Sequence, residues 1–195
     1  MLSKSIRIVA LITYFTQLTS VSGSTETRFF PSHDAFVRKD KAYKSQGKAP
    51  KITVTQHGSN QRIGLMKFDT ADYDEENFDG MDVKAYLRLG VAETHEDGPV
   101  QVKIMRLEED FHEDSVSWGS LSGDADAESY VSFTVKKDHV NRMGQVEVSR
   151  LLRPGKDTVL AFVIEDQGHV KFHSKEHELG RMKPSLILKS EGIEL

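Results

Sequence analysis

The sequence predicts an antiparallel all-β jelly-roll sandwich made of one domain. Nine or ten short runs alternate apolar and polar residues and are separated by turn signals, which is typical of sandwich strands. No long helix is indicated, and neither an internal repeat nor an interdomain linker divides the chain. The 195 residues suffice for one domain with a substantial core.

The strands predicted in the first half alternate most clearly. In 51–55, Ile52 and Val54 share one face. In 62–69, Met66 and Phe68 share one face, while Leu65 and Lys67 share the other, which we expect to be open and to carry cations. The predicted strands are 35–37, 51–55, 62–69 and 83–91, and the acidic stretch 70–82 is predicted to be a loop.

The second half contains the most apolar strand. Residues 159–164 are continuously apolar, so we expect a central strand that is covered on both faces. Around Leu151 the apolar spacing changes from two to three or four, which indicates a strand end or a single helical turn before Pro154. The other predicted strands are 100–107, 130–135, 146–148, 170–174 and 185–188, with irregular segments at 111–118 and 120–129.

The N-terminal segment has the layout of a secretory signal peptide. Lys4 and Arg7 precede a short apolar run, and Gly23 ends a stretch of small residues suited to cleavage. The run is too short and too polar for a membrane span, and an N-terminal anchor is the alternative. We therefore expect a signal peptide at 1–23, a β-sandwich module at 24–190 and a C-terminal tail at 191–195, with the mature protein secreted and extracellular.

Composition excludes several classes of protein. The formal charge is −4, and loss of the two cations of the signal peptide makes it −6, so nothing indicates a nucleic-acid partner. The chain has no cysteine, which excludes disulfides, thiol catalysis and Cys-ligated zinc. The domain must be stabilised by its own core, with or without a bound ion.

Six motifs occur in a fixed order: 34–37, 62–69, 85–89, 111–118, 172–176 and 184–188. With these motifs the chain resembles carbohydrate-binding module family 96, also described as disaggregatase-related repeat domains, over about residues 28–189. The resemblance implies a β-jelly roll that binds an acidic polysaccharide such as alginate, without catalysis. Lys67 and Lys175 stand where the family often has Arg, and the loop after Trp118 lacks the Asn expected there. Bidentate carboxylate clamps would become point charges at the two lysines.

Cations and aromatic rings are the candidate ligand-binding groups. A uronate polymer carries a carboxylate on each sugar, so its recognition needs several cations on a rigid surface. The candidates are Arg62, Lys67 and Lys175 on motif strands, and Lys41, Tyr43 and Lys51 in or beside a lysine-rich loop. The alternatives are a solvated loop, and an ion pair of Arg62 with Asp34 or Glu176. The single tryptophan, Trp118, is predicted to pack on the core.

No cofactor is expected other than a structural calcium ion as an alternative, for which Asp34, Asp69 and Glu176, or the acidic loop 72–76, are the candidate ligands. No ordered calcium-binding loop is present. His173 and His177 form an H-x-x-x-H pair beside Glu176. On an extended strand these two residues would be about 13 Å apart, too far to share a zinc ion.

The favoured hypothesis is a secreted, non-catalytic and monomeric module that binds an acidic polysaccharide through a basic face. The second hypothesis is a structural or adhesive protein of a cell wall or extracellular matrix. The third is a small polysaccharide lyase, for which His173, Tyr86 and Arg62 could serve. The sequence contains none of the common hydrolase, nucleotide-binding or metalloprotease motifs, which disfavours an enzyme.

Overall fold

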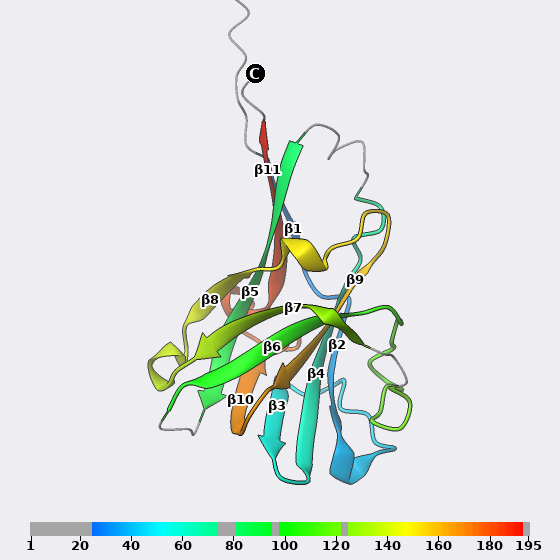
Figure 1. The fold of residues 1–195 in the computed structure, drawn as a ribbon, viewed down its shortest axis with the longest axis vertical. Coiled ribbons are helices and arrows are strands. Elements are labelled where there is room, and N and C mark those ends of the chain that lie inside the picture. Colours follow the sequence, from blue (N-terminus) through cyan, green and yellow to red (C-terminus); the bar gives the residue numbers. More distant parts are fainter. Residues whose placement is uncertain (1–24, 74–80, 95–97, 122–124, 193–195) are drawn as a thin grey trace, which may run out of the picture.

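The computed structural model describes residues 25–73, 81–94, 98–121 and 125–192 (Figure 1). In these residues every strand pairing is antiparallel, and helical structure is limited to single 3₁₀ turns. The predicted all-β antiparallel class is confirmed, while the jelly-roll topology stays a prediction. The predicted signal peptide lies outside the described residues.

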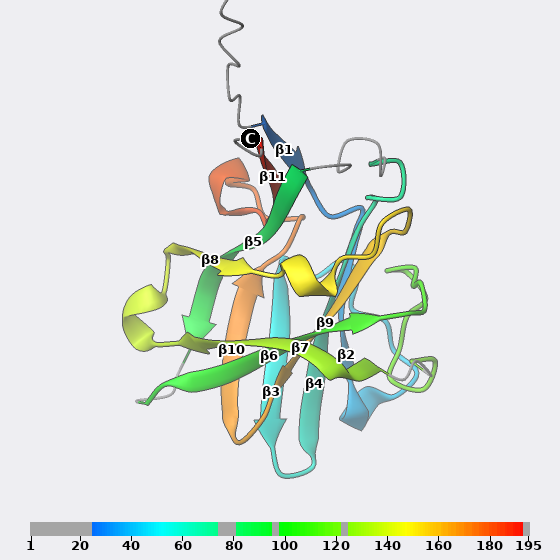
Figure 2. The same ribbon diagram turned by 45° about the horizontal axis from the view of Figure 1, so that its top comes forward.

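The strands form one curled sheet of eleven strands. Its path is β1-β11-β5-β10-β3-β4-β9-β6-β7, with β2 added beside β4 and β8 beside β5. Figure 2 shows β6 and β7 crossing in front of β3, β4 and β10. The strands are β1 (Thr25–Phe29), β2 (His33–Arg38), β3 (Lys51–His57), β4 (Asn60–Phe68), β5 (Met81–Thr94), β6 (Val100–Leu107), β7 (Ala125–Val135), β8 (Met143–Glu147), β9 (Thr158–Ile164), β10 (Gly168–His173) and β11 (Ser185–Gly192).

Four single 3₁₀ turns connect the strands in the described part of the chain. They are η1 (Lys39–Lys41), η3 (Lys137–His139), η4 (Ser149–Leu151) and η5 (Gly180–Met182). The turn η4 is the single helical turn that the changed spacing around Leu151 indicates, and Leu151 is fully buried within it. No helix among the described residues has both the length and the apolar character that a membrane crossing requires.

Each predicted strand is present, but several boundaries differ. The strand β1 is additional, and β7 begins at Ala125, inside the predicted loop 120–129. The strand β8 ends at Glu147, and the next N–H, that of Val148, donates to the Ala85 carbonyl as the chain enters η4. The strand β11 continues to Gly192, two residues into the predicted tail. These boundaries are set by pairing with distant strands, which local periodicity does not report.

The central strand β9 lies between β4 and β6 and is covered on both faces, as predicted. Leu160 and Phe162 belong to the main core, in which the Phe162 and Phe172 rings lie 6.0 Å apart. Val159 and Ala161 belong to a second, smaller cluster on the opposite face. The sheet is therefore a rigid layer between two apolar clusters.

The second cluster changes the expectation for β4. Phe111 and Val116 pack on Leu65 and cover the face that we expected to be open. That expectation is wrong because the irregular segment 111–118 folds back over β2, β4 and β9. Trp118 is partly buried against the same cluster, so its predicted packing on the core is confirmed.

Candidate functional site

Lys67 lies at the edge of the second cluster, among carboxylates. Its Nζ is 2.7 Å from Asp110, 3.2 Å from Asp157 and 4.0 Å from Asp69, and only 11% of its side chain is exposed. The hydrogen bond to Asp110 is the main reason that the pKa of Lys67 is raised. The charge of this lysine is thus balanced within the protein.

Lys175 lies in a second group of carboxylates. Its Nζ is 3.1 Å from Glu113 and also pairs with Glu176. Burial opposes the charged form, but the hydrogen bonds to Glu176 and Glu113 raise the pKa of Lys175. The Lys175 N–H donates to the carboxylate of Asp34, which is 1% exposed, and burial raises the pKa of Asp34 to about 7.

The three candidate calcium ligands do not come together as one set. Asp34 and Glu176 surround Lys175, whereas Asp69 lies beside Lys67 and accepts a hydrogen bond from Ser32. Among the described residues, no three His, Cys, Asp or Glu side chains are grouped as a metal site needs. A lysine ammonium lies where a cation bound between Glu113 and Glu176 would be placed.

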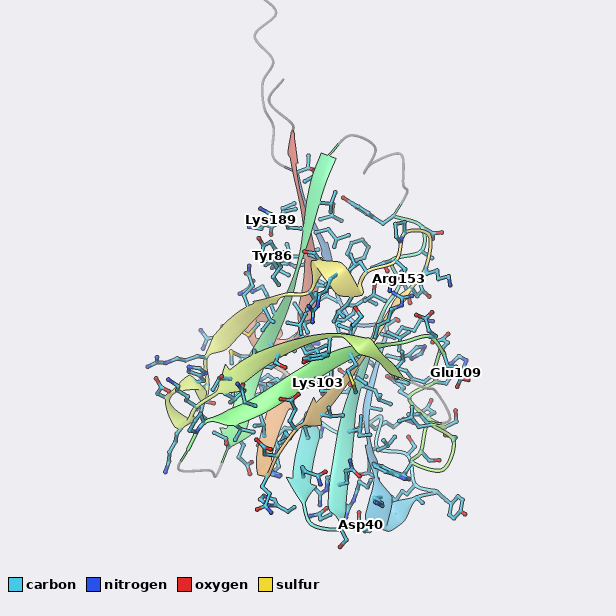
Figure 3. The ribbon with its side chains drawn as sticks, in the orientation of Figure 1. Asp40, Tyr86, Lys103, Glu109, Arg153 and Lys189 are labelled. Atoms are coloured by element: carbon cyan, nitrogen blue, oxygen red, sulfur yellow. The ribbon has the colours of Figure 1, made fainter. Side chains whose placement is uncertain are left out.

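Arg62 begins the basic region at one end of the sheet. In the pairing of β2 with β4 it lies directly opposite Arg38, and neither Asp34 nor Glu176 pairs with it. Burial and, secondly, the charge of Arg38 lower the pKa of Arg62, and its Nε is buried without a hydrogen-bond partner. Arg38 is itself bonded to Asp40 by Nε at 3.0 Å and by Nη2 at 2.5 Å. Figure 3 shows Asp40 at this end of the molecule.

The lysine-rich loop follows directly from β2 and is held in place at three points. Gly119 N–H donates to Ala42 O at 2.8 Å, and the Ser45 hydroxyl donates to Glu113 O. Gly47 is buried so tightly against the Glu113 backbone that any side chain there would clash. The loop therefore presents its side chains from a fixed backbone.

Tyr43 is the most prominent side chain of this loop. It is 94% exposed, the highest value among the exposed large apolar side chains of the described residues. Its ring leans over Gly119, where an added Cβ would lie 3.3 Å from it. Lys41 and Lys44 flank Tyr43, are exposed, and have no carboxylate partner among the described residues.

Trp118 adds a second ring behind this loop. Lys39 places its Nζ 5.9 Å from the centroid of the Trp118 ring, within the range of a cation–π contact. We call the whole surface the loop platform, defined by Arg38, Lys39, Lys41, Tyr43, Lys44 and Arg62. Asp40 is the one carboxylate that lies within this stretch of the described chain.

Lys51 lies apart from the loop platform. Its Nζ is 3.4 Å from Glu93, which also binds Lys171 at 2.7 Å. Of the six predicted ligand-binding residues, Lys41 and Tyr43 thus lie together on the loop, and Arg62 lies beside its start, opposite Arg38. The structure places Lys51, Lys67 and Lys175 in separate ion pairs.

The separation of about 13 Å expected between His173 and His177 on an extended strand is wrong. The strand β10 ends at His173, and a turn follows in which His177 N–H donates to Ser174 O at 3.1 Å. The two rings stack with centroids 3.9 Å apart. Burial lowers the pKa of His173 to about 4, and the nearby His177 adds to this effect.

Sequence reasoning missed Arg38 as a member of the site. Arg38 ends a strand whose other residues are mostly buried, and its role depends on the β2–β4 register that puts it opposite Arg62. The run of charged residues 38–41 is the one signal in the sequence that could have pointed to it.

An exposed ring flanked by cations offers an apolar face and positive charges to a ligand on the same surface. The sequence model of carbohydrate-binding module family 96 matches residues 25–190, most of the chain. The chain belongs to this family, and the family indicates carbohydrate binding. None of the curated proteins compared matches the chain.

Proposed function

We propose that the chain is a secreted, non-catalytic module that binds an acidic, uronate-containing polysaccharide through the loop platform. The observation that carries the proposal is the 94% exposure of Tyr43 between lysines that no described carboxylate neutralises. A large ring with such exposure contributes almost nothing to the core. It is available to stack against the face of a sugar.

The chemistry of a uronate chain suits this surface. The C–H face of a pyranose packs on an aromatic ring, and each carboxylate seeks a cation or a hydrogen-bond donor. A single exposed ion pair contributes about 0–1 kcal/mol, so useful affinity requires several pairs that form together. Lys39, Lys41 and Lys44 supply such a row from one fixed loop.

Charge balance supports the loop platform over the other lysines of the initial prediction. Lys67 and Lys175 already have carboxylate partners within hydrogen-bond distance. A polysaccharide carboxylate would have to displace those partners and leave them near its own negative charge. Lys41 and Lys44 require no such exchange.

Affinity electrophoresis against alginate, pectate and a neutral glucan tests the proposal. We expect retardation by the polyuronates and none by the glucan. Tyr43→Ala should abolish the retardation, whereas Phe30→Ala, which removes another exposed ring (58% exposed), should not. Equal behaviour of the two variants would contradict the proposal.

Two further parts of the proposal have their own measurements. Absence of catalysis predicts that long incubation with the same polyuronates releases no unsaturated products, which absorb ultraviolet light. Export predicts that the mature protein, recovered outside the cell, begins at Ser24. An N-terminus that retains residues 1–23 would contradict the signal peptide and support the anchor.

A further inference from the structure

A pocket opens between the edge strands β7 and β8, away from the loop platform. Each strand has one partner among the described strands: β7 pairs with β6, and β8 pairs with β5. The turn at η3 joins them, as Figures 1 and 2 show. The facing edges of the two strands thus leave backbone N–H and C=O groups outside the ladders.

The floor of this pocket is apolar and its rim is polar. Phe172 and Phe133, with ring centroids 6.1 Å apart, line it together with Leu89 and Val91. His139, Arg142, Gln145 and Thr134 line it from the two edge strands and the turn between them. Among the described residues, no Asp or Glu lines the pocket.

The turn that carries Arg142 is fixed to β5. Asn141 N–H donates to Val91 O at 2.8 Å, and Val91 N–H donates to Arg142 O at 3.1 Å. Asn141 adopts a positive φ of 61°, which asparagine tolerates better than most residues. The exposed Arg142 side chain has no ion-pair partner among the described residues. A cation is therefore held at the mouth of an apolar pocket and remains unneutralised.

We propose that this pocket binds a single uronate sugar, such as the end residue of an acidic polysaccharide chain. The inference rests on the proposed function and adds a second kind of subsite to it. The pyranose C–H face would lie on Phe133 and the apolar floor, and its hydroxyls would meet Gln145 and the open strand edges. Its carboxylate would pair with Arg142.

The size of the pocket sets the size of the ligand. Its volume is about 260 Å³, below the range of about 300–1,000 Å³ for sites that enclose drug-sized ligands. One ring matches this space better than an oligosaccharide does. The pocket therefore differs in role from the loop platform, which is open and suited to the interior of a chain.

Titration of the full chain with methyl glucuronide, followed by ligand-observed NMR, tests the proposal. We expect saturable binding, and weaker binding of the uncharged methyl glucoside. Arg142→Ala should weaken uronide binding at least about tenfold, because a charge-assisted hydrogen bond is lost. Arg181→Ala is the matched control, because Arg181 is exposed on η5 and its substitution removes the same charge at a distant place.

Several outcomes would overturn the proposal. They are an absence of saturable uronide binding, equal binding by Arg142→Ala and Arg181→Ala, and self-association through the open edges that the uronide does not affect. Failure of the proposed function gives a different result. In that case Tyr43→Ala would leave polyuronate binding unchanged, whereas the monosaccharide would still bind in a manner that depends on Arg142. If only the pocket inference fails, the polymers still bind and Tyr43→Ala still abolishes that binding.

Discussion

Asp34→Asn should change how the stability of the protein depends on pH. Asp34 is buried, and burial raises its pKa from 3.8 to about 7 in spite of the hydrogen bond from the Lys175 N–H. Between these pH values the folded protein binds a proton that the unfolded chain does not bind. The free energy of unfolding contributed by this group therefore falls as pH rises from about 4 to about 7.

The size of the effect follows from the shift. Each pKa unit corresponds to about 1.4 kcal/mol, so a shift of about three units amounts to about 4 kcal/mol at most. Asparagine keeps an acceptor for the Lys175 N–H and carries no charge. The variant should therefore gain stability over the wild type as pH rises, and the difference should level off only about one pH unit above the folded-state pKa.

Urea unfolding of both proteins between pH 4 and pH 8 measures this difference, and contributions from other groups cancel. Asp40→Asn is the control of opposite sign, since its hydrogen bond with Arg38 lowers the pKa of Asp40. That group stabilises the fold above its ordinary pKa, and this contribution is lost as pH falls. A stability difference between wild type and Asp34→Asn that does not vary with pH would refute the reasoning.

Three further variants test the core and the cations. Phe162→Ala should lower the free energy of unfolding, measured in urea, by about 3–5 kcal/mol, because apolar burial is lost and a cavity remains. Phe30→Ala, which changes an exposed ring, is the control and should be nearly neutral. A loss below about 1 kcal/mol for Phe162→Ala would contradict the central position of β9. Arg62→Ala should change the free energy of unfolding by less than about 1 kcal/mol, because it removes a repulsion from Arg38 and no ion pair. The same variant should bind polyuronate more weakly. A loss of several kcal/mol of stability would show that Arg62 has a structural partner. Lys67→Met should lower the free energy of unfolding by about 1–3 kcal/mol, because Asp110 and Asp157 lose their cation while remaining partly solvated. The variant should bind polyuronate as the wild type does. Weaker binding by a folded Lys67→Met would show that Lys67 contacts the ligand.

The sequence was sufficient for the fold class and for most strands because alternation reports which face of a strand is buried. It could not reveal that segment 111–118 covers the outer face of β4, since that contact joins residues distant in the sequence. The same limit explains Lys67, whose partners Asp110 and Asp157 lie more than 40 residues away. A lysine on an alternating strand looks the same whether it faces solvent or a carboxylate.

For the loops and turns, the sequence predicted some of the site residues and not others, for a related reason. The lysine-rich composition of the loop is enough to single out Tyr43 and Lys41, and the structure places both on the loop platform. The place of Arg38 depends on the β2–β4 register, and His173 and His177 meet because a turn, not an extended strand, lies between them. Side chains that meet through a turn or across a pairing need the tertiary structure to be seen together.

The most direct test of carbohydrate recognition by the loop platform compares two double variants of equal charge. Lys41→Ala/Lys44→Ala removes two cations of the platform, and Lys84→Ala/Lys156→Ala removes two cations elsewhere. Calorimetric titration with a polyuronate at about 0.1 M and 1 M salt, where the Debye length falls from about 10 Å to about 3 Å, separates local from general charge effects. We expect the platform variant to bind at least about tenfold more weakly at low salt and to lose most of the salt dependence, while the control behaves as the wild type. Equal affinities and equal salt dependence of the two variants would contradict binding at the loop platform.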